Sequence, residues 1–153
     1  MAFLQNTAAI EVEDTQQNRY LTFLLGDETY GIAISNVIEI IGILPVTPLP
    51  GAPEYLKGIT NLRGKIIPVI DVRLKFKKPA AEYDERTCIV VVEVQEMTVG
   101  LIIDEVSEVL TIEEQDIVPP PAMKDMQAGY ISGISKTDGK VKLLLDCTAL
   151  LYE

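Results

Sequence analysis

Residues 55–71 read Y-L-K-G-I-T-N-L-R-G-K-I-I-P-V-I-D, and residues 130–146 read Y-I-S-G-I-S-K-T-D-G-K-V-K-L-L-L-D. A tyrosine, two glycines, an isoleucine, a lysine and the final aspartate recur in register. In each stretch, two apolar, strand-like runs flank a two-residue turn. The second turn is Asp138-Gly139, and Asp-Gly between two such runs is a favoured signal of a two-residue hairpin. The repeat therefore predicts a β-hairpin that the chain builds twice.

A second pair of related segments lies upstream of these hairpins. Residues 29–39 read T-Y-G-I-A-I-S-N-V-I-E, and residues 98–108 read T-V-G-L-I-I-D-E-V-S-E. The two pairs keep the same order along the chain, which indicates an internal duplication with a short insertion in the second copy. We expect features that both copies keep to be architectural, and features of one copy to be candidates for function.

Short strands, tight turns and single helical turns make up most of the remaining sequence. Four prolines between residues 45 and 53 exclude a helix from the connection that precedes the first hairpin. No helical segment is long enough to serve as a crossover between parallel strands, so a βαβ sheet is disfavoured. The pattern favours an all-β fold of two small barrels, which would also hide their strand edges.

The chain divides into a tail and one compact domain. We expect residues 1–18, which are polar and irregular, to form a flexible N-terminal tail. Residues 19–153 form the domain, with a first lobe at about 19–80 and a second at about 81–153. Each lobe is only about 65 residues, which is small for an independent core, so the lobes are expected to share buried surface. Whether strands are exchanged between lobes stays open.

Composition excludes several classes of function. The net charge is −10 and histidine is absent, so attraction to nucleic-acid phosphates or anionic membranes is not expected. No signal peptide is visible, and the longest apolar runs are shorter than a membrane span. Cys88 and Cys147 are the two cysteines, and Cys147 replaces Val72 of the other copy. A reduced, cytoplasmic location is the simplest interpretation.

Catalysis, cofactors and metals find little support in the sequence. Without histidine, a Ser–His or Cys–His nucleophile cannot be built, and a zinc site lacks ligands. The run Glu113, Glu114 and Asp116 lacks the spacing and glycine of a calcium loop. We therefore predict a protein that is not an enzyme and has no cofactor or metal site. A small β-barrel enzyme based on carboxylates is a weaker alternative.

Aspartates and a serine at equivalent places predict helix caps. Asp71 and Asp146 each precede a short amphipathic segment, and their side chains could accept bonds from the free N–H groups there. Ser35, with Asp104 in the second copy, is expected to cap another short helix. Capping is thus a more economical role for the duplicated aspartates than acid–base chemistry.

The turn of the first hairpin departs from its counterpart. If the two turns share geometry, the first central position needs a positive φ, which Asp138 tolerates better than Arg63. Departures from a local preference are often found at functional sites. The simpler interpretation is an ordinary exposed hairpin arginine. An ion pair between Glu39 and Arg63 is a further hypothesis, whose value would lie in positioning the arginine.

These segments together resemble the CheW family of chemotaxis coupling proteins. The resemblance rests on Y-G-I at residues 30–32, V-I-E-I at residues 37–40, the N-L-R-G turn at residues 61–64 and the segment 100–109. It covers roughly residues 19–151. The family fold consists of two five-stranded SH3-like barrels packed around a common apolar core, and we expect the same fold here.

The resemblance also implies a function and a set of site residues. Family members are non-catalytic adaptors that couple methyl-accepting chemoreceptors, through their cytoplasmic tip, to the regulatory domain of the histidine kinase CheA. The expected location is the cytoplasm, at the inner face of the membrane through receptor complexes, with no direct membrane insertion. The positions implied for receptor binding are Val37, Glu39, Asn61, Leu62 and Arg63.

Other positions are implied for support and for the kinase. Gly58, which has a counterpart in Gly133, and Asp71 are expected to support the structure. Val118 and Met123 in the second lobe are candidates for kinase contact. An unrelated all-β adaptor that binds peptides, for example by strand addition, remains the alternative from a different class.

Overall fold

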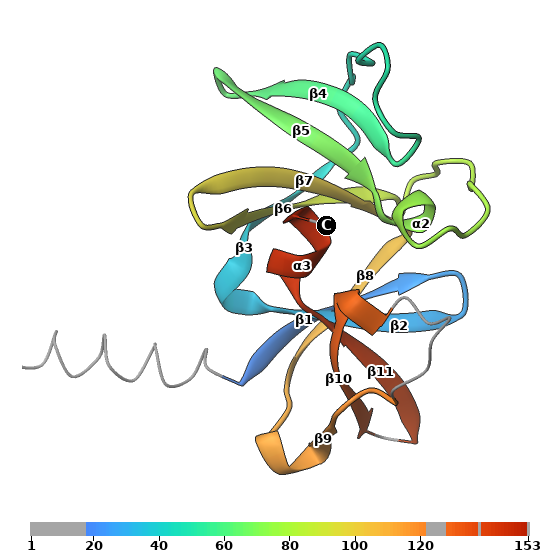
Figure 1. The fold of residues 1–153 in the computed structure, drawn as a ribbon, viewed down its shortest axis with the longest axis vertical. Coiled ribbons are helices and arrows are strands. Elements are labelled where there is room, and N and C mark those ends of the chain that lie inside the picture. Colours follow the sequence, from blue (N-terminus) through green and yellow to red (C-terminus); the bar gives the residue numbers. More distant parts are fainter. Residues whose placement is uncertain (1–17, 122–127, 138, 153) are drawn as a thin grey trace, which may run out of the picture.

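Eleven strands and five short helices make up the part of the chain that the structure, a computed structural model, describes: residues 18–121, 128–137 and 139–152 (Figure 1). The expected tail at residues 1–18 lies outside this part except for its last residue. The strands are β1 (Arg19–Leu25), β2 (Glu28–Ala33), β3 (Val37–Gly42), β4 (Leu56–Leu62), β5 (Lys65–Asp71), β6 (Cys88–Val94), β7 (Met97–Ile103), β8 (Glu105–Thr111), β9 (Ile117–Val118), β10 (Ile131–Thr137) and β11 (Lys140–Leu145). The helices are η1 (Ile34–Asn36), α2 (Val72–Lys75), η2 (Glu114–Asp116), η3 (Ala128–Tyr130) and α3 (Cys147–Tyr152). The prediction of a mainly β fold is confirmed.

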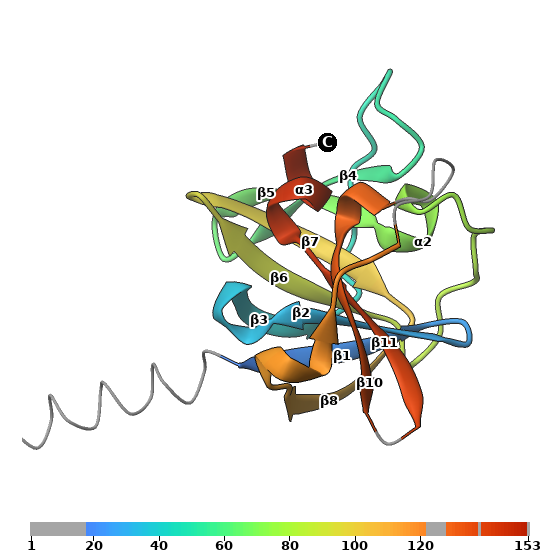
Figure 2. The same cartoon turned by 60° about the horizontal axis from the view of Figure 1, so that its bottom comes forward.

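Two sheets contain all of these strands. The five-stranded sheet has the order β3-β6-β7-β5-β4, and the six-stranded sheet has the order β8-β1-β2-β11-β10-β9. Figure 2 shows β1, β2, β8, β10 and β11 together below β6 and β7. The sixth strand of the larger sheet is β9, a two-residue strand that pairs with β10.

The sheets do not follow the boundary expected near residue 80. Strands β3, β4 and β5 from the first sequence copy form a sheet with β6 and β7 from the second. Strands β1 and β2 in turn join β8, β10 and β11. Each lobe therefore combines strands of both copies, as the open possibility of strand exchange allowed. Strand partners are set by backbone hydrogen bonds across the fold, which proximity in sequence does not dictate.

The exchange is symmetric down to single residues. In one sheet β2 pairs in parallel with β11, and Gly31 lies opposite Leu144. In the other, β7 pairs in parallel with β5, and Gly100 lies opposite Val69. A Cβ on Gly31 would lie 2.9 Å from Leu144 Cδ2, and a Cβ on Gly100 would lie 2.8 Å from Ile89 Cγ2. The repeated glycine thus makes room for an apolar side chain of a neighbouring strand, which is β11 at Gly31 and β6 at Gly100.

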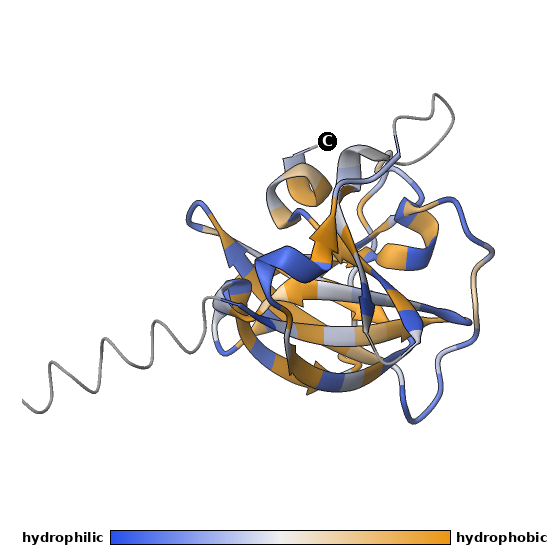
Figure 3. Cartoon of the chain, turned by 90° about the horizontal axis from the view of Figure 1, so that it is seen from below, coloured by the Kyte–Doolittle hydropathy of each residue, from blue (hydrophilic) through white to orange (hydrophobic). Residues whose placement is uncertain are grey.

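One apolar core joins the two sheets. It includes Phe23 of β1 and Leu101 of β7, with Val72 of α2 and Leu150 of α3, all fully buried. Apolar residues concentrate along the strands, whereas many of the turns are hydrophilic (Figure 3). A second, smaller cluster, formed by Ile67, Val69, Ile89, Val91 and Ile102, lies within the five-stranded sheet. The main core contains residues of both sheets, as expected if the two lobes share buried surface.

Aromatic side chains connect α2 to the six-stranded sheet and its neighbours. The ring centroids of Phe23 and Tyr30 are 5.8 Å apart, those of Tyr30 and Phe76 are 5.4 Å apart, and those of Phe76 and Tyr130 are 5.6 Å apart. The buried ammonium of Lys75 lies 4.0 Å from the ring centroid of Tyr55. These contacts fix α2 between elements of both copies.

The predicted caps at Asp71 and Asp146 are present in equivalent form. Asp71 Oδ1 accepts from the N–H groups of Arg73 and Leu74, at 3.0 and 3.5 Å. Asp146 Oδ1 accepts from the N–H groups of Thr148 and Ala149, at 2.9 and 3.3 Å. Each carboxylate therefore satisfies free N–H groups at the start of a short helix.

The predicted caps at Ser35 and Asp104 are wrong. Ser35 lies inside η1, whose N-cap position is Ala33 and carries no side-chain cap. Asp104 precedes β8 rather than a helix, and its carboxylate pairs with Arg73. The chain continues into a strand at both places, so no run of free helical N–H groups forms there.

The two caps allow a matched test of stability. Asp71 also accepts from the Tyr83 hydroxyl at 2.8 Å and is 3% exposed, whereas Asp146 is exposed. We expect Asp146→Ala to lower the free energy of unfolding by about 1 kcal/mol through loss of the cap. We expect Asp71→Ala to cost roughly 2–3 kcal/mol, because Tyr83 also loses a partner. Urea unfolding measures both, and equal losses would contradict the extra role of Asp71.

Two general features complete the fold. None of the helices in the described ranges has the length and hydropathy needed to cross a membrane. Within the same ranges, no three side chains of His, Cys, Asp or Glu are grouped closely enough to hold a metal ion.

Both cysteines are free, and burial raises the pKa of the Cys147 thiol to about 12, which keeps it protonated at neutral pH.

Candidate functional site

The turn between β4 and β5 has the geometry that the sequence predicted. Arg63 has a φ of +52° and Gly64 a φ of +87°, and the flanking residues Leu62 and Lys65 pair directly. Two positive φ values in a two-residue hairpin loop define a type I′ turn. A left-handed conformation costs an ordinary L-residue about 1–2 kcal/mol, so something else holds Arg63 in this conformation.

Arg63 forms the ion pair that the sequence raised as a hypothesis. Its Nη1 donates to Glu39 Oε2 at 2.6 Å. Glu39 lies on β3 and Arg63 follows β4, and these strands are the opposite edges of the five-stranded sheet. The curvature of the sheet therefore brings its two edges within reach of one side-chain pair. The Arg63 side chain stays 70% exposed, so its guanidinium is available to a partner.

Electrostatics keep this pair charged. The hydrogen bond from Arg63 lowers the pKa of Glu39, and the same bond raises the pKa of Arg63. The other carboxylate oxygen of Glu39, Oε1, is buried and has no hydrogen-bond partner among the described residues. The pair is thus partly shielded on the carboxylate side and open to solvent on the guanidinium side.

The other predicted contact residues differ in what they can offer a partner. Leu62 is partly buried against the smaller apolar cluster. Val37 is partly buried against the main core and pairs with Val92 of β6. Asn61 is exposed, but its Oδ1 accepts from the Gly64 N–H at 2.7 Å and is therefore used within the turn. Arg63, whose side chain is 70% exposed, offers a partner a charged group that is open to solvent.

Three exposed isoleucines near this turn were missed from the sequence. Ile38 and Ile40 on β3 are 51% and 45% exposed, and Ile66 on β5 is 58% exposed. Ile66 pairs with Asn61 and lines a groove of about 330 Å³ below the proline-rich connection. In β3 the sequence V-I-E-I-I places apolar residues on both faces, which is typical of a strand buried on both sides, so no signal of this exposure was present in the sequence.

Gly58 allows a close backbone contact between β4 and the proline-rich connection that precedes it. Its φ is +146°, and a Cβ there would lie 2.0 Å from the Thr47 carbonyl oxygen. Thr47 and Ile59 exchange two backbone hydrogen bonds, at 2.8 and 3.0 Å, which fix the connection against β4. The close approach requires glycine at this position.

Val118, one of the two residues expected to contact a kinase, lies away from the Arg63 turn. Val118 is 55% exposed at the end of β9, the edge strand of the six-stranded sheet. Met123 lies outside the described residues. The structure thus places Val118 on a different sheet from the Arg63 turn.

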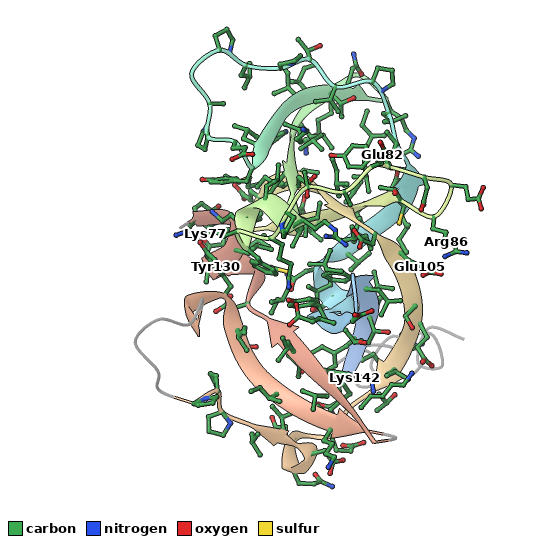
Figure 4. All side chains as sticks on the ribbon, turned by 90° about the vertical axis from the view of Figure 1, so that its right-hand side faces the viewer. Lys77, Glu82, Arg86, Glu105, Tyr130 and Lys142 are labelled. Carbon is green, nitrogen blue, oxygen red and sulfur yellow. The ribbon has the colours of Figure 1, made fainter. Side chains whose placement is uncertain are left out.

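A polar cavity of about 300 Å³ lies where the junction loop, residues 76–87 between α2 and β6, meets the sheets. Its wall includes Glu82, Arg86 and Glu105, which Figure 4 labels on the same side of the molecule. Arg73 binds Asp104 through two hydrogen bonds, at 2.8 and 2.5 Å, and the bond from Arg73 lowers the pKa of Asp104.

The carboxylates of this cavity serve the fold. Asp104 accepts from the Gly26 N–H as well as from Arg73, and Asp71 accepts from Tyr83 as well as from α2. Both carboxylates therefore accept hydrogen bonds in fixed contacts within the fold.

Comparison with known proteins adds independent information. The family model described as a CheW-like domain matches residues 19–153. The chemotaxis protein CheW of Klebsiella aerogenes is 37% identical over 139 residues, which are 90% of this chain and 84% of that protein. The CheW of Rhizobium meliloti is 35% identical over 127 residues, 82% of each chain. The crystal structure of the scaffolding protein TtCheW from Thermoanaerobacter tengcongensis superposes with a TM-score of 0.83 at 36% identity, covering 89% of this chain and 93% of that one.

Proposed function

The chain belongs to the CheW-like family and is a chemotaxis coupling protein, and we propose that it joins the histidine kinase CheA to the cytoplasmic tip of methyl-accepting chemoreceptors. It does so as a non-catalytic adaptor that holds both partners in a fixed relative geometry. Its working location is the cytoplasm, at the inner face of the membrane through the receptor complexes. The observation that carries the proposal is the exposed Arg63 guanidinium at a sheet edge bordered by apolar side chains.

The Arg63 turn has the properties of a docking surface for a helical partner. A receptor tip is a helical hairpin, and an amphipathic helix binds by laying its apolar face against an apolar surface. Ile40 and Ile66 supply exposed apolar area on β3 and β5. The guanidinium of Arg63 can bind a carboxylate or the free carbonyl groups at the end of a helix.

The same reasoning assigns supporting roles to neighbours. Glu39 orients Arg63 by their ion pair, and Val37 fixes the start of β3 through its contact with the core. Val118, on β9 of the six-stranded sheet, is proposed to meet the kinase together with Met123. Separate surfaces are what an adaptor needs, because both partners must be bound at once.

Signal transmission requires more than simultaneous binding. A receptor can change the state of the kinase through this protein only if the complex binds two receptor states with different free energies. The apolar core shared by both sheets favours transmission through the relative placement of the two surfaces, without a large change inside the protein.

A binding experiment tests the proposal. The purified protein is mixed with the CheA regulatory domain and, separately, with a soluble receptor-tip fragment, and complexes are measured by isothermal calorimetry and co-elution. We expect each partner to bind alone and all three to form one complex. Binding to neither partner would refute the function. Capture of unrelated extended peptides along the free edge of β3 would instead support the peptide-binding adaptor.

A further inference from the structure

We propose that Asn61 is a positioning residue that holds Arg63 in its left-handed conformation, and that it does not itself contact the receptor. The inference rests on the proposed function, because it explains how the receptor-binding arginine is presented. It assigns to Asn61 a role different from that of the other residues in the N-L-R-G turn.

The geometry of the turn gives Asn61 this role. Its Oδ1 accepts from the Gly64 N–H at 2.7 Å. The acceptor and the donor lie on either side of Arg63, so the bond closes a small ring around the arginine backbone. In a type I′ turn, both Arg63 and Gly64 need positive φ. The side-chain bond therefore stabilises the one backbone conformation that is unfavourable for an arginine.

The duplication supplies a comparison within the same chain. The second hairpin has Lys136 at the place of Asn61 and Asp138 at the place of Arg63. A lysine side chain has no acceptor to offer the glycine N–H, but aspartate tolerates a left-handed conformation without that help. The first hairpin, whose Arg63 is unfavourable in a left-handed conformation, is thus the hairpin in which a side-chain acceptor, Asn61, precedes the turn. The two departures of the first hairpin have a common explanation.

The consequence is control over where the guanidinium lies. A type I′ turn fixes the direction of the Arg63 side chain, and the ion pair with Glu39 at 2.6 Å then fixes its end. Within the described residues, this is the one hydrogen bond of the guanidinium, so its other donors remain for a partner. Losing the bond from the Gly64 N–H to Asn61 would let the backbone leave the left-handed region and carry the guanidinium away from Glu39.

Two variants of the full chain separate positioning from contact. Asn61→Ala removes the acceptor, and Asn61→Asp keeps one at the same place. Lys136→Ala is the matched control in the other hairpin. The readouts are the affinity for the soluble receptor-tip fragment, the exchange rate and temperature coefficient of the Gly64 amide, and the φ of Arg63 from NMR couplings.

We expect Asn61→Ala to speed exchange of the Gly64 amide, to shift the Arg63 φ distribution, and to weaken receptor binding by about tenfold, which corresponds to about 1.4 kcal/mol. Asn61→Asp should restore all three, and Lys136→Ala should change none of them. Unchanged receptor affinity in Asn61→Ala despite a freed Gly64 amide would overturn the inference. So would lost affinity in Asn61→Asp with the amide still protected, because it would make Asn61 a direct contact.

A failure of the proposed function would look different. If the wild-type protein does not bind the receptor fragment, the Gly64 amide and the Arg63 φ still report on the turn. If Asn61→Ala loses the protection of the Gly64 amide and the positive φ of Arg63, and Asn61→Asp recovers both, the result would support positioning of Arg63 for another partner. An unchanged Gly64 amide and an unchanged φ in Asn61→Ala would refute positioning whatever the partner is.

Discussion

Arg63→Glu is expected to leave the protein folded and to weaken its binding to the receptor tip by roughly 10- to 100-fold, about 1.4–2.8 kcal/mol. Arg63 is 70% exposed and lies in a surface turn, so the change removes no core packing. The new carboxylate would face Glu39, with which Arg63 now pairs at 2.6 Å, and the repulsion would move it outward. It would also repel any acidic or carbonyl group that the arginine binds on the receptor.

Calorimetry with the receptor-tip fragment and with the CheA regulatory domain measures the effect. Arg86→Glu is the matched control, because it makes the same change of charge at an exposed arginine of the junction loop. We expect the control to bind the receptor tip normally, and we expect both variants to bind the kinase normally. Wild-type receptor affinity in Arg63→Glu would show that the arginine has no part in the interface.

Gly58→Ala is expected to lower the free energy of unfolding by at least about 3 kcal/mol, or to prevent folding. Two causes act together. A φ of +146° belongs to a region that is essentially restricted to glycine, and the added Cβ would lie 2.0 Å from the Thr47 carbonyl oxygen and 2.9 Å from Pro48 Cα. Neither neighbour can move easily, because Thr47 is held to Ile59 by two backbone hydrogen bonds.

Urea unfolding followed by circular dichroism measures this loss. Gly42→Ala is the control, because a Cβ on Gly42 would meet no atom within 4 Å and its φ is ordinary. We expect that variant to stay within about 0.5 kcal/mol of the wild type. If Gly58→Ala unfolded at the wild-type urea concentration, the close approach of the connection to β4 would be wrong. Receptor binding by Gly58→Ala is informative only if the variant folds.

Much of the local structure could be read from the sequence. The hairpins were predicted from apolar, strand-like runs around two-residue turns. The positive φ at Arg63 was predicted by comparing this position with Asp138. The caps at Asp71 and Asp146 followed from aspartates before short amphipathic segments. All of these features depend on contacts between residues close in sequence, which local chemistry controls.

Errors arose where distant segments meet. Ser35 and Asp104 were read as caps because their residue types favour capping, but the chain continues into strands β3 and β8 there. Asp104 is instead engaged by Arg73, a residue far away in sequence. The exposed isoleucines Ile40 and Ile66 were missed, because an apolar residue in a strand is by default expected to face a core.

The sequence by itself determined that the chain is a duplicated, mainly β, acidic protein of the CheW-like family, with an unusual arginine in one hairpin turn. The tertiary structure decided which strands share a sheet, and it placed Glu39 beside Arg63 across the two edges of one sheet. The physical reason is the separation along the chain between the residues that interact. Turn and cap energies arise within a few residues, whereas sheet order and edge closure depend on the total burial and hydrogen bonding of the whole chain, which no single segment encodes.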